Sequence, residues 1–267
     1  MKKSFLLLSL LCGALSAWAH DAEVDGIFYN LDARNMTATV TFKENKYNSY
    51  EGKYAGDVVI PETVTFEGLT YSVTRLGDDC FTGCSRLTSV TLPNSVTSLE
   101  DDCFAGCNSL ERIEVDAANT VYDSRENCNA IIHTSTNELV VGCKNSKIPN
   151  SVTSLGYACF GGCSSLTSIY MLPSTPPSTK FGIFDDAPLE TVYVVDEYAK
   201  TAYQAQYPWR QYSIVVMPTG IEELQTDKTT PTIVGYYDLS GRPINGKQRG
   251  AVILRYSNGT TRKVLVK

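Results

Sequence analysis

The sequence predicts a repeat solenoid of the α/β to mainly β class, with an N-terminal β cap and a small C-terminal antiparallel β module. Three observations support this prediction. A segment rich in cysteine and phenylalanine recurs in phase along the chain, and the apolar residues between its copies fit neither a long helix nor a long strand. Residues 220–267 carry a basic surplus, whereas residues 20–219 are strongly acidic, which indicates a separate C-terminal module. Repeat units that cannot bury an apolar face alone do so by stacking on their neighbours.

Composition narrows the class of protein. Of the 267 residues, 43% are hydrophobic and 19% are charged, which argues against an intrinsically disordered chain. Acidic residues outnumber basic ones by 29 to 23, and a nucleic-acid-binding protein usually has a basic surplus. The chain has only two histidines, His20 and His133, and none of the common hydrolase or phosphate-binding motifs. We therefore predict no catalytic residues, no metal site and no cofactor.

The first 19 residues have the pattern of a secretory signal peptide. Lys2 and Lys3 precede an apolar run from Phe5 to Leu15, and Ala17 and Ala19 form an A-x-A end. The apolar run is too short for a transmembrane helix, which needs about 20 apolar residues. The sequence thus predicts export, with a secreted or cell-surface location and no transmembrane span.

The repeat itself is specific. The segment C-F-T-G-C at residues 80–84 returns 23 residues later at 103–107, and again after a further 56 residues at 159–163. A spacing of 56 leaves room for one enlarged repeat, which we place at about residues 116–148. A last copy keeps only apolar positions such as Ile183 and Leu189. The repeats are predicted to span residues 73–195.

Each repeat also contains a short strand. Leu87, Val90 and Leu92 form an L-x-x-L-x-L element, the strand-forming part of a leucine-rich repeat. Parallel strands lie about 4.8 Å apart, so equivalent side chains of neighbouring repeats are expected to form rows in the interior. The expected aromatic row contains Phe81, Phe104 and Phe160, and the expected leucine row contains Leu87, Leu110, Leu166 and Leu189.

These motifs resemble a known family. The unit C-x-x-L-x-x-I-x-L-P-x-x-V-x-x-L-x-x-x-A-F-x-G is similar to the BspA-like (TpLRR-type) leucine-rich repeats of bacterial surface proteins, over about residues 60–195. The chain departs from the pattern at Cys80, Cys103 and Cys159, where the family usually has alanine. The resemblance implies a non-catalytic protein that adheres to host extracellular-matrix components or to other bacteria.

The side of the strands that faces solvent is the expected binding surface. Residues that flank the central apolar position of L-x-x-L-x-L point away from the core. The predicted concave strand face consists of Ser89, Thr91, Arg112, Glu114, Ser168, Tyr170, Thr191 and Tyr193. We expect Tyr170 and Tyr193 to anchor a host or bacterial surface protein or a glycan, because aromatic residues dominate interface energetics. The alternatives are an ordinary solvated face and a spacer module of the cell envelope without a specific ligand.

The flanking segments complete the predicted organisation. Residues 20–72 are expected to form the N-terminal β cap, and residues 196–219 a helix and a strand. Residues 220–232 are polar and are interpreted as a linker. Residues 233–267 contain three candidate strands, and the segments Tyr236–Arg242 and Gly250–Leu254 resemble the C-terminal sorting domains of type IX secretion substrates.

Eight cysteines follow the signal peptide. The six in C-x-x-x-C pairs are expected to be buried thiols, since a buried cysteine behaves as a small apolar residue. Cys128 and Cys143 flank a predicted hairpin, formed by residues 129–133 and 138–143, that would bring them near each other. The sequence leaves two alternatives open for this pair, a disulfide and two free thiols.

Overall fold

The computed structural model describes residues 20–42, 54–100, 102–218, 233–244, 250–256 and 261–266. The expected signal peptide, residues 1–19, and the expected linker, residues 220–232, lie outside these ranges. The chain divides into two compact units, Met1–Met217 and Pro218–Lys267. The described residues are mostly in β-strands and contain one α-helix.

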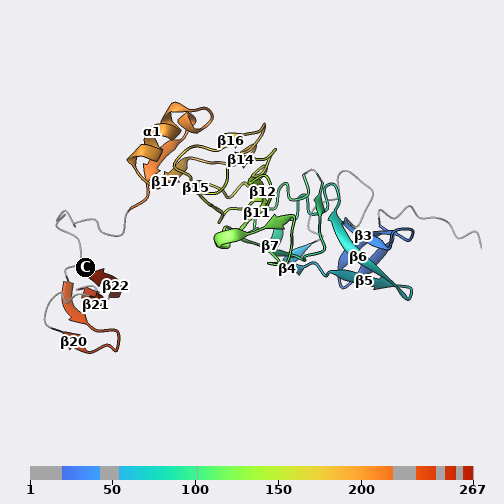
Figure 1. Ribbon diagram of the computed structural model, residues 1–267, viewed down its shortest axis with the longest axis horizontal. Helices are drawn as coiled ribbons and strands as arrows, with labels where there is room; N and C mark the ends of the chain where they lie inside the picture. Colours follow the sequence, from blue (N-terminus) through green and yellow to red (C-terminus); the bar gives the residue numbers. More distant parts are fainter. Residues whose placement is uncertain are drawn as a thin grey trace, which may run out of the picture. The chain divides into compact units, whose positions relative to one another are not determined.

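The first unit begins with antiparallel strands, coloured blue in the ribbon (Figure 1). Tight turns at Asp25–Gly26 and Glu67–Gly68 use left-handed backbone conformations. Strand β6 also pairs in parallel with β3 and with the short strand β8 of the first complete repeat, so the N-terminal sheet continues directly into the repeats. The strands of this sheet are β1 (Ala22–Val24), β2 (Ile27–Asp32), β3 (Thr37–Thr41), β5 (Thr63–Phe66), β6 (Leu69–Leu76) and β8 (Ser98–Leu99).

The L-x-x-L-x-L segments form two parallel sheets in this unit. The first sheet consists of β4 (Ala55–Val59), β7 (Arg86–Leu92) and β9 (Arg112–Val115) in that order. The second consists of β13 (Lys147–Ile148), β15 (Ser168–Met171), β17 (Thr191–Val194) and β18 (Ser213–Val216). Equivalent apolar residues are in register, with Val90 opposite Ile113 and Ile169 opposite Val192, and all four are buried.

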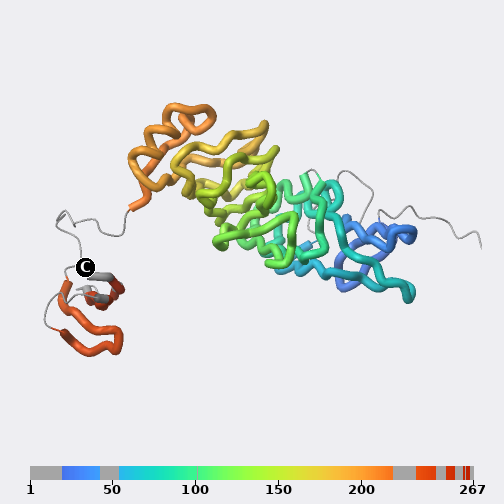
Figure 2. The backbone as a smooth tube through the Cα atoms, in the orientation of Figure 1, coloured from blue at the N-terminus to red at the C-terminus, as the bar shows by residue number. Residues whose placement is uncertain are grey.

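The enlarged repeat separates these two sheets. Its strands β10 (Tyr122–Asp123), β11 (Ala130–His133) and β12 (Glu138–Gly142) are antiparallel, with the short 3-10 helix η1 (Arg125–Asn127) between β10 and β11. Strand β12 then pairs in parallel with β14 (Ser154–Leu155), which pairs with β16 (Ser178–Thr179). The backbone tube shows the irregular path of this segment, in green, between the flanking repeats (Figure 2).

The repeats end at helix α1 (Glu197–Ala205) and the 3-10 helix η2 (Trp209–Gln211). The carboxylate of Asp196 accepts a hydrogen bond of 2.8 Å from the backbone N–H of Ala199 and so caps the start of α1. Tyr203 and Trp209 are completely buried, and their rings lie 5.2 Å apart. These side chains close the apolar interior beyond the last repeat.

The second unit is a small antiparallel sheet. Its strands follow the order β20 (Pro243–Ile244), β19 (Ile233–Tyr237), β21 (Gly250–Tyr256) and β22 (Thr261–Val266). The expected strands at residues 233–238, 251–256 and 262–266 are present, and β20 is an additional one. Asp238 stabilises the turn after β19, because its Oδ1 atom accepts hydrogen bonds from the backbone N–H groups of Ser240 and Arg242.

The apolar interior of the first unit has two buried clusters. The rings of Phe81 and Phe104 stack at 5.1 Å in the first cluster, whereas Phe160 stacks on Phe184 at 5.5 Å in the second. The expected row of Phe81, Phe104 and Phe160 is therefore divided. Leu87 and Leu110 lie in the first cluster and Leu166 and Leu189 in the second, and all four are buried.

Gly142 explains the division of the aromatic row. Its N–H donates to the carbonyl of Cys159, just as the N–H of Phe81 donates to the carbonyl of Cys103. Gly142 thus holds the aromatic position of the enlarged repeat, and any side chain there would overlap the ring of Phe160. The neighbouring phenylalanine fills the space that the missing ring leaves.

The described cysteines are reduced thiols. Cys128 and Cys143, the pair for which a disulfide was considered, are not bridged. The sulfur of Cys128 contacts the carbonyl of Ala130, and the sulfur of Cys143 contacts the carbonyl of Asn129. Burial raises the pKa of Cys128 to about 11 and that of Cys163 to about 12, so both stay protonated at neutral pH.

The Gly142→Ala substitution tests the divided aromatic row. We expect it to destabilise the protein by about 1–3 kcal/mol, because the added methyl group overpacks against Phe160. In a Phe160→Leu background, which removes the ring, the same substitution should cost less. Urea unfolding of the four proteins in this double-mutant cycle measures the coupling. If the losses in unfolding free energy of the two single substitutions simply add in the double variant, the predicted contact is contradicted.

Candidate binding surface

The strand face is the outward side of strands β4, β7, β9, β13, β15, β17 and β18. The structure pairs the residues predicted for it across neighbouring strands, in two separate groups. The pairs are Ser89 with Arg112, Thr91 with Glu114, Ser168 with Thr191, and Tyr170 with Tyr193. We call the first two pairs, on β7 and β9, the polar half, and the last two, on β15 and β17, the tyrosine half.

The tyrosine half carries two stacked rings. The rings of Tyr170 and Tyr193 lie 4.9 Å apart with an angle of 16° between their planes, and Tyr170 is 38% exposed. Lys147 on β13 is opposite Tyr170, and Val215 on β18 is opposite Tyr193. Val215 is 37% exposed. The result is a flat row of four side chains with an aromatic centre.

Sequence reasoning missed Lys147 and Val215. Lys147 stands 23 residues before Tyr170, so the repeat period alone could have placed it on the strand face. It was not assigned there because it lies within the segment given to the enlarged repeat, about residues 116–148. Val215 lies beyond the last recognised copy, after α1 and η2, where the period is no longer visible in the sequence.

The polar half contains one ion pair and lies beside a hydrogen bond between neighbouring strands. Arg112 and Glu114, two residues apart on β9, form the ion pair. Thr88 on β7 donates a hydrogen bond of 3.0 Å to the carboxylate of Asp57 on β4. Val59, which lies opposite Thr91, is 67% exposed and adds an apolar position that the sequence did not reveal.

A hollow of about 740 Å³ lies on the far side of β9, and we call it the central hollow. It exists because no parallel strand follows β9 in its sheet. Ser124 covers part of the open edge, since its hydroxyl accepts a hydrogen bond of 3.0 Å from the N–H of Val115. Arg112, Glu114 and Asn127 are among its lining residues.

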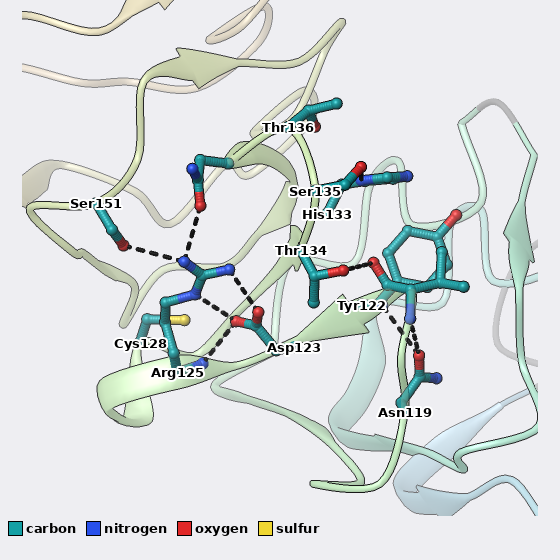
Figure 3. Close-up of polar contacts among 12 residues, drawn as sticks. Asn119, Tyr122, Asp123, Arg125, Cys128, His133, Thr134, Ser135, Thr136 and Ser151 are labelled. Atoms are coloured by element: carbon teal, nitrogen blue, oxygen red, sulfur yellow. Dashed lines mark hydrogen bonds and ion pairs between the residues drawn. The ribbon is translucent and has the colours of Figure 1, made fainter.

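Arg125 fixes the wall of the central hollow (Figure 3). Its Nε atom donates to Asp123 at 2.7 Å, and its Nη1 atom donates to Asn137 at 2.8 Å and to Ser151 at 3.3 Å. The hydrogen bonds to Asp123 raise the pKa of Arg125. One guanidinium group therefore joins η1, the turn of the hairpin and the following repeat.

Asn119 fixes the other end of the enlarged repeat. It is buried, and its side-chain amide donates hydrogen bonds of 2.9 Å to the carbonyls of Pro93 and Val96 in the preceding repeat. Its Oδ1 atom accepts hydrogen bonds from the N–H groups of Val121 and Tyr122, as the lower right of Figure 3 shows in part. The wall of the central hollow is thus attached on both sides.

His133 lies at the end of the hairpin. Its ring meets that of Tyr122 edge to face at 5.6 Å, and Ser135 lies 3.3 Å from its Nδ1 atom (Figure 3). These contacts are local to the turn and do not form the catalytic arrangement of a hydrolase. In the described part of the chain, no group of three or more His, Cys, Asp or Glu side chains could hold a metal ion. Its one α-helix is too short to span a bilayer.

A comparison with protein families gives a clear result. A family model described as a BspA type leucine-rich repeat region of six copies matches residues 62–140 and 130–228. These matches include all the repeats described above and more than half of the chain. A comparison with curated proteins finds no match.

Solved structures of bacterial leucine-rich repeat proteins are similar to this chain. A leucine-rich repeat protein from Bacteroides ovatus is 20% identical with a TM-score of 0.39, over 66% of this chain and 50% of its own length. A leucine-rich cell surface protein from Faecalibacterium prausnitzii is 17% identical with a TM-score of 0.38, over 90% of this chain and 59% of its own. The leucine-rich repeat protein of T. pallidum is 22% identical with a TM-score of 0.33, over 65% and 71%. The chain thus spans only half the length of the first of these proteins.

The Arg125→Ala substitution tests the wall of the central hollow. We expect a loss of about 1–3 kcal/mol in unfolding free energy, because the partly buried hydrogen bonds to Asp123, Asn137 and Ser151 are lost together. Hydrogen–deuterium exchange should accelerate at residues 123–137. Arg112→Ala is the matched control, since this exposed arginine has one ion pair worth about 0–1 kcal/mol. Equal effects of the two substitutions would contradict the assigned role of Arg125.

Proposed function

Since this chain belongs to the BspA-type leucine-rich repeat family, we propose that it is a non-catalytic protein that binds a partner macromolecule on its strand face. The partner is a surface protein of a host or of another bacterium. The stacked pair of exposed Tyr170 and half-buried Tyr193 is the observation that supports this proposal most directly. A fold alone does not specify a ligand, so the argument depends on this surface.

The tyrosine half has the make-up of an interface centre. Its two rings form a rigid apolar area that loses little conformational entropy on binding, because stacking already restricts both side chains. Exposed Lys147 lies at one end of the rings and Val215 at the other, and the small polar residues Ser168, Thr191 and Ser213 lie along one side in register. An aromatic centre within a polar rim is typical of the residues that supply most of the energy in protein interfaces.

The polar half and the central hollow would extend the contact. The ion pair of Arg112 with Glu114 leaves no large surplus charge on this half, so it can accept a neutral polar surface. The exposed Val59 provides a second apolar contact. A partner segment that protrudes from such a surface could enter the central hollow.

The alternative function is a spacer module of the cell envelope without a specific ligand. The self-contained ion pair and hydrogen bonds of the polar half favour it, because such side chains need no partner. The tyrosine half favours binding, since a spacer has no need of a stacked aromatic pair at the surface.

We also propose how the remaining segments serve this function. Residues 1–19 would direct export and be removed, and residues 20–72 would cap a single solenoid of repeats. Residues 233–267 would act as a sorting domain of the type IX kind, joined through a linker at 220–232. The antiparallel sheet of β19 to β22 supports the presence of a separate C-terminal module.

The double substitution Tyr170→Ala with Tyr193→Ala tests the binding role. Immobilised collagen, laminin and fibronectin and whole bacterial cells serve as ligands for chain 20–267 in surface plasmon resonance and adhesion assays. Where the unchanged protein binds, we expect the double variant to lose at least roughly tenfold in affinity, as removal of an interface anchor does.

Tyr198→Ala is the matched control for this experiment. Tyr198 is 72% exposed on α1 and does not belong to the strand face, so its loss should leave binding unchanged. Circular dichroism verifies that all variants fold. If none of these ligands binds the unchanged protein, or if the control weakens binding as much as the double variant, the spacer function is the better description.

A further inference from the structure

A second pair of exposed aromatic residues lies away from the strand face. Tyr157 and Phe181 follow the short strands β14 and β16, which form a different row of strands from the tyrosine half. They are 56% and 76% exposed, and their rings stack at 6.3 Å with an angle of 24°. The strand-face proposal does not involve them. Adjacent exposed rings of this size call for an explanation.

The register shows that these rings replace acidic residues. Two backbone hydrogen bonds align each repeat with the one before it at this corner. The N–H of Glu100 donates to the carbonyl of Leu76, and the N–H of Lys180 donates to the carbonyl of Leu155. By that alignment the position of Tyr157 and Phe181 is the position of Asp78 in the first complete repeat. The packing of the repeat therefore does not require an aromatic side chain here.

A small cavity of about 190 Å³ lies beside Tyr157, and we call it the corner cavity. It lies between the repeat of Phe104 and the repeat of Phe160, next to strand β12, which pairs with β14 at this place. Phe104 and Val141 are part of its apolar lining. Gly156 lies in its wall and packs closely against β12, since a Cβ atom at that position would lie 2.9 Å from the carboxylate of Glu138 and 3.0 Å from the carbonyl oxygen of Leu139.

Two ion pairs lie at the corner cavity. Lys180 binds Glu138 at 2.7 Å across Gly156, and Arg75 binds Glu100 at 2.9 Å. Asp102 also lines the cavity, so an anionic ligand would meet a surplus of carboxylates. A neutral ligand that both donates and accepts hydrogen bonds could add to the Lys180–Glu138 pair without breaking it.

From this arrangement we infer that Tyr157, Phe181 and the corner cavity form a binding site for a neutral saccharide chain. The pyranose ring has an apolar face of C–H groups that packs flat on an aromatic ring, and hydroxyls at its edge that donate and accept hydrogen bonds. Tyr157 and Phe181 offer the aromatic surface, while Lys180 and Glu138 offer a donor and an acceptor beside it. The cavity is smaller than a typical pocket of about 300–1,000 Å³, so it suits a single sugar unit of a longer chain.

Calorimetric titration of chain 20–267 with neutral hexasaccharides tests this site. The probes are cellohexaose, chitohexaose, maltohexaose and laminarihexaose, which differ in linkage and in the groups on each ring. We expect at least one to bind, with an affinity that 1 M NaCl does not reduce, since the probes carry no charge. Tyr157→Ser and Phe181→Ser should each weaken that binding roughly tenfold or more.

Two controls separate this site from the strand face. Tyr198→Ser removes a tyrosine of α1 that is even more exposed than Tyr157, and Tyr170→Ala removes an anchor of the tyrosine half. Neither should change saccharide binding, and Tyr157→Ser should not change adhesion to matrix proteins. Each proposal can therefore fail while the other holds.

Three results would overturn the inference. The first is that no hexasaccharide binds at millimolar concentration. The second is saccharide binding that persists when both Tyr157 and Phe181 are serine. The third is that a hexa-arginine peptide binds there in a salt-sensitive way while the sugars do not.

Discussion

The fold depends on one constraint, which is that equivalent apolar residues of successive repeats must lie directly over one another. Parallel strands a few ångströms apart leave no room for a shift in register, because each buried side chain contacts its counterpart in the next strand. Val90 against Ile113 and Ile169 against Val192 satisfy this constraint with complete burial. The polar residues on either side of these positions then face solvent in rows, without any further requirement on their identity.

The enlarged repeat is where this constraint is met differently. A regular repeat would place a phenylalanine between Phe104 and Phe160, but the chain has Gly142 there, and the ring of Phe160 fills its space. The antiparallel strands β10 to β12 also interrupt the row of L-x-x-L-x-L strands. The central hollow and the corner cavity both adjoin this interruption, so the features that distinguish this surface from a uniform one have a common origin.

The sequence predicted the regular part of the fold well, and the physical reason is the repeat period. Strands at residues 86–92, 168–171 and 191–194 follow from apolar positions that recur every 23 residues, as does the pairing of Tyr170 with Tyr193. The irregular part could not be predicted in the same way. The space beside Gly142 depends on a ring 18 residues further along the chain, and the contacts of Arg125 join three segments that no local pattern relates.

Electrostatics connects the two proposed sites. Residues 20–219 contain 25 acidic and 13 basic side chains, so a basic partner would be attracted to this unit from a distance. Yet Arg112 is paired with Glu114 on the polar half, and Lys180 is paired with Glu138 at the corner cavity. Aromatic surface is available at Tyr170 with Tyr193 on the tyrosine half and at Tyr157 with Phe181 beside the corner cavity. Close contact at either site would then gain its free energy from burial of apolar area, and the acidic surplus elsewhere would affect the rate of encounter more than the affinity.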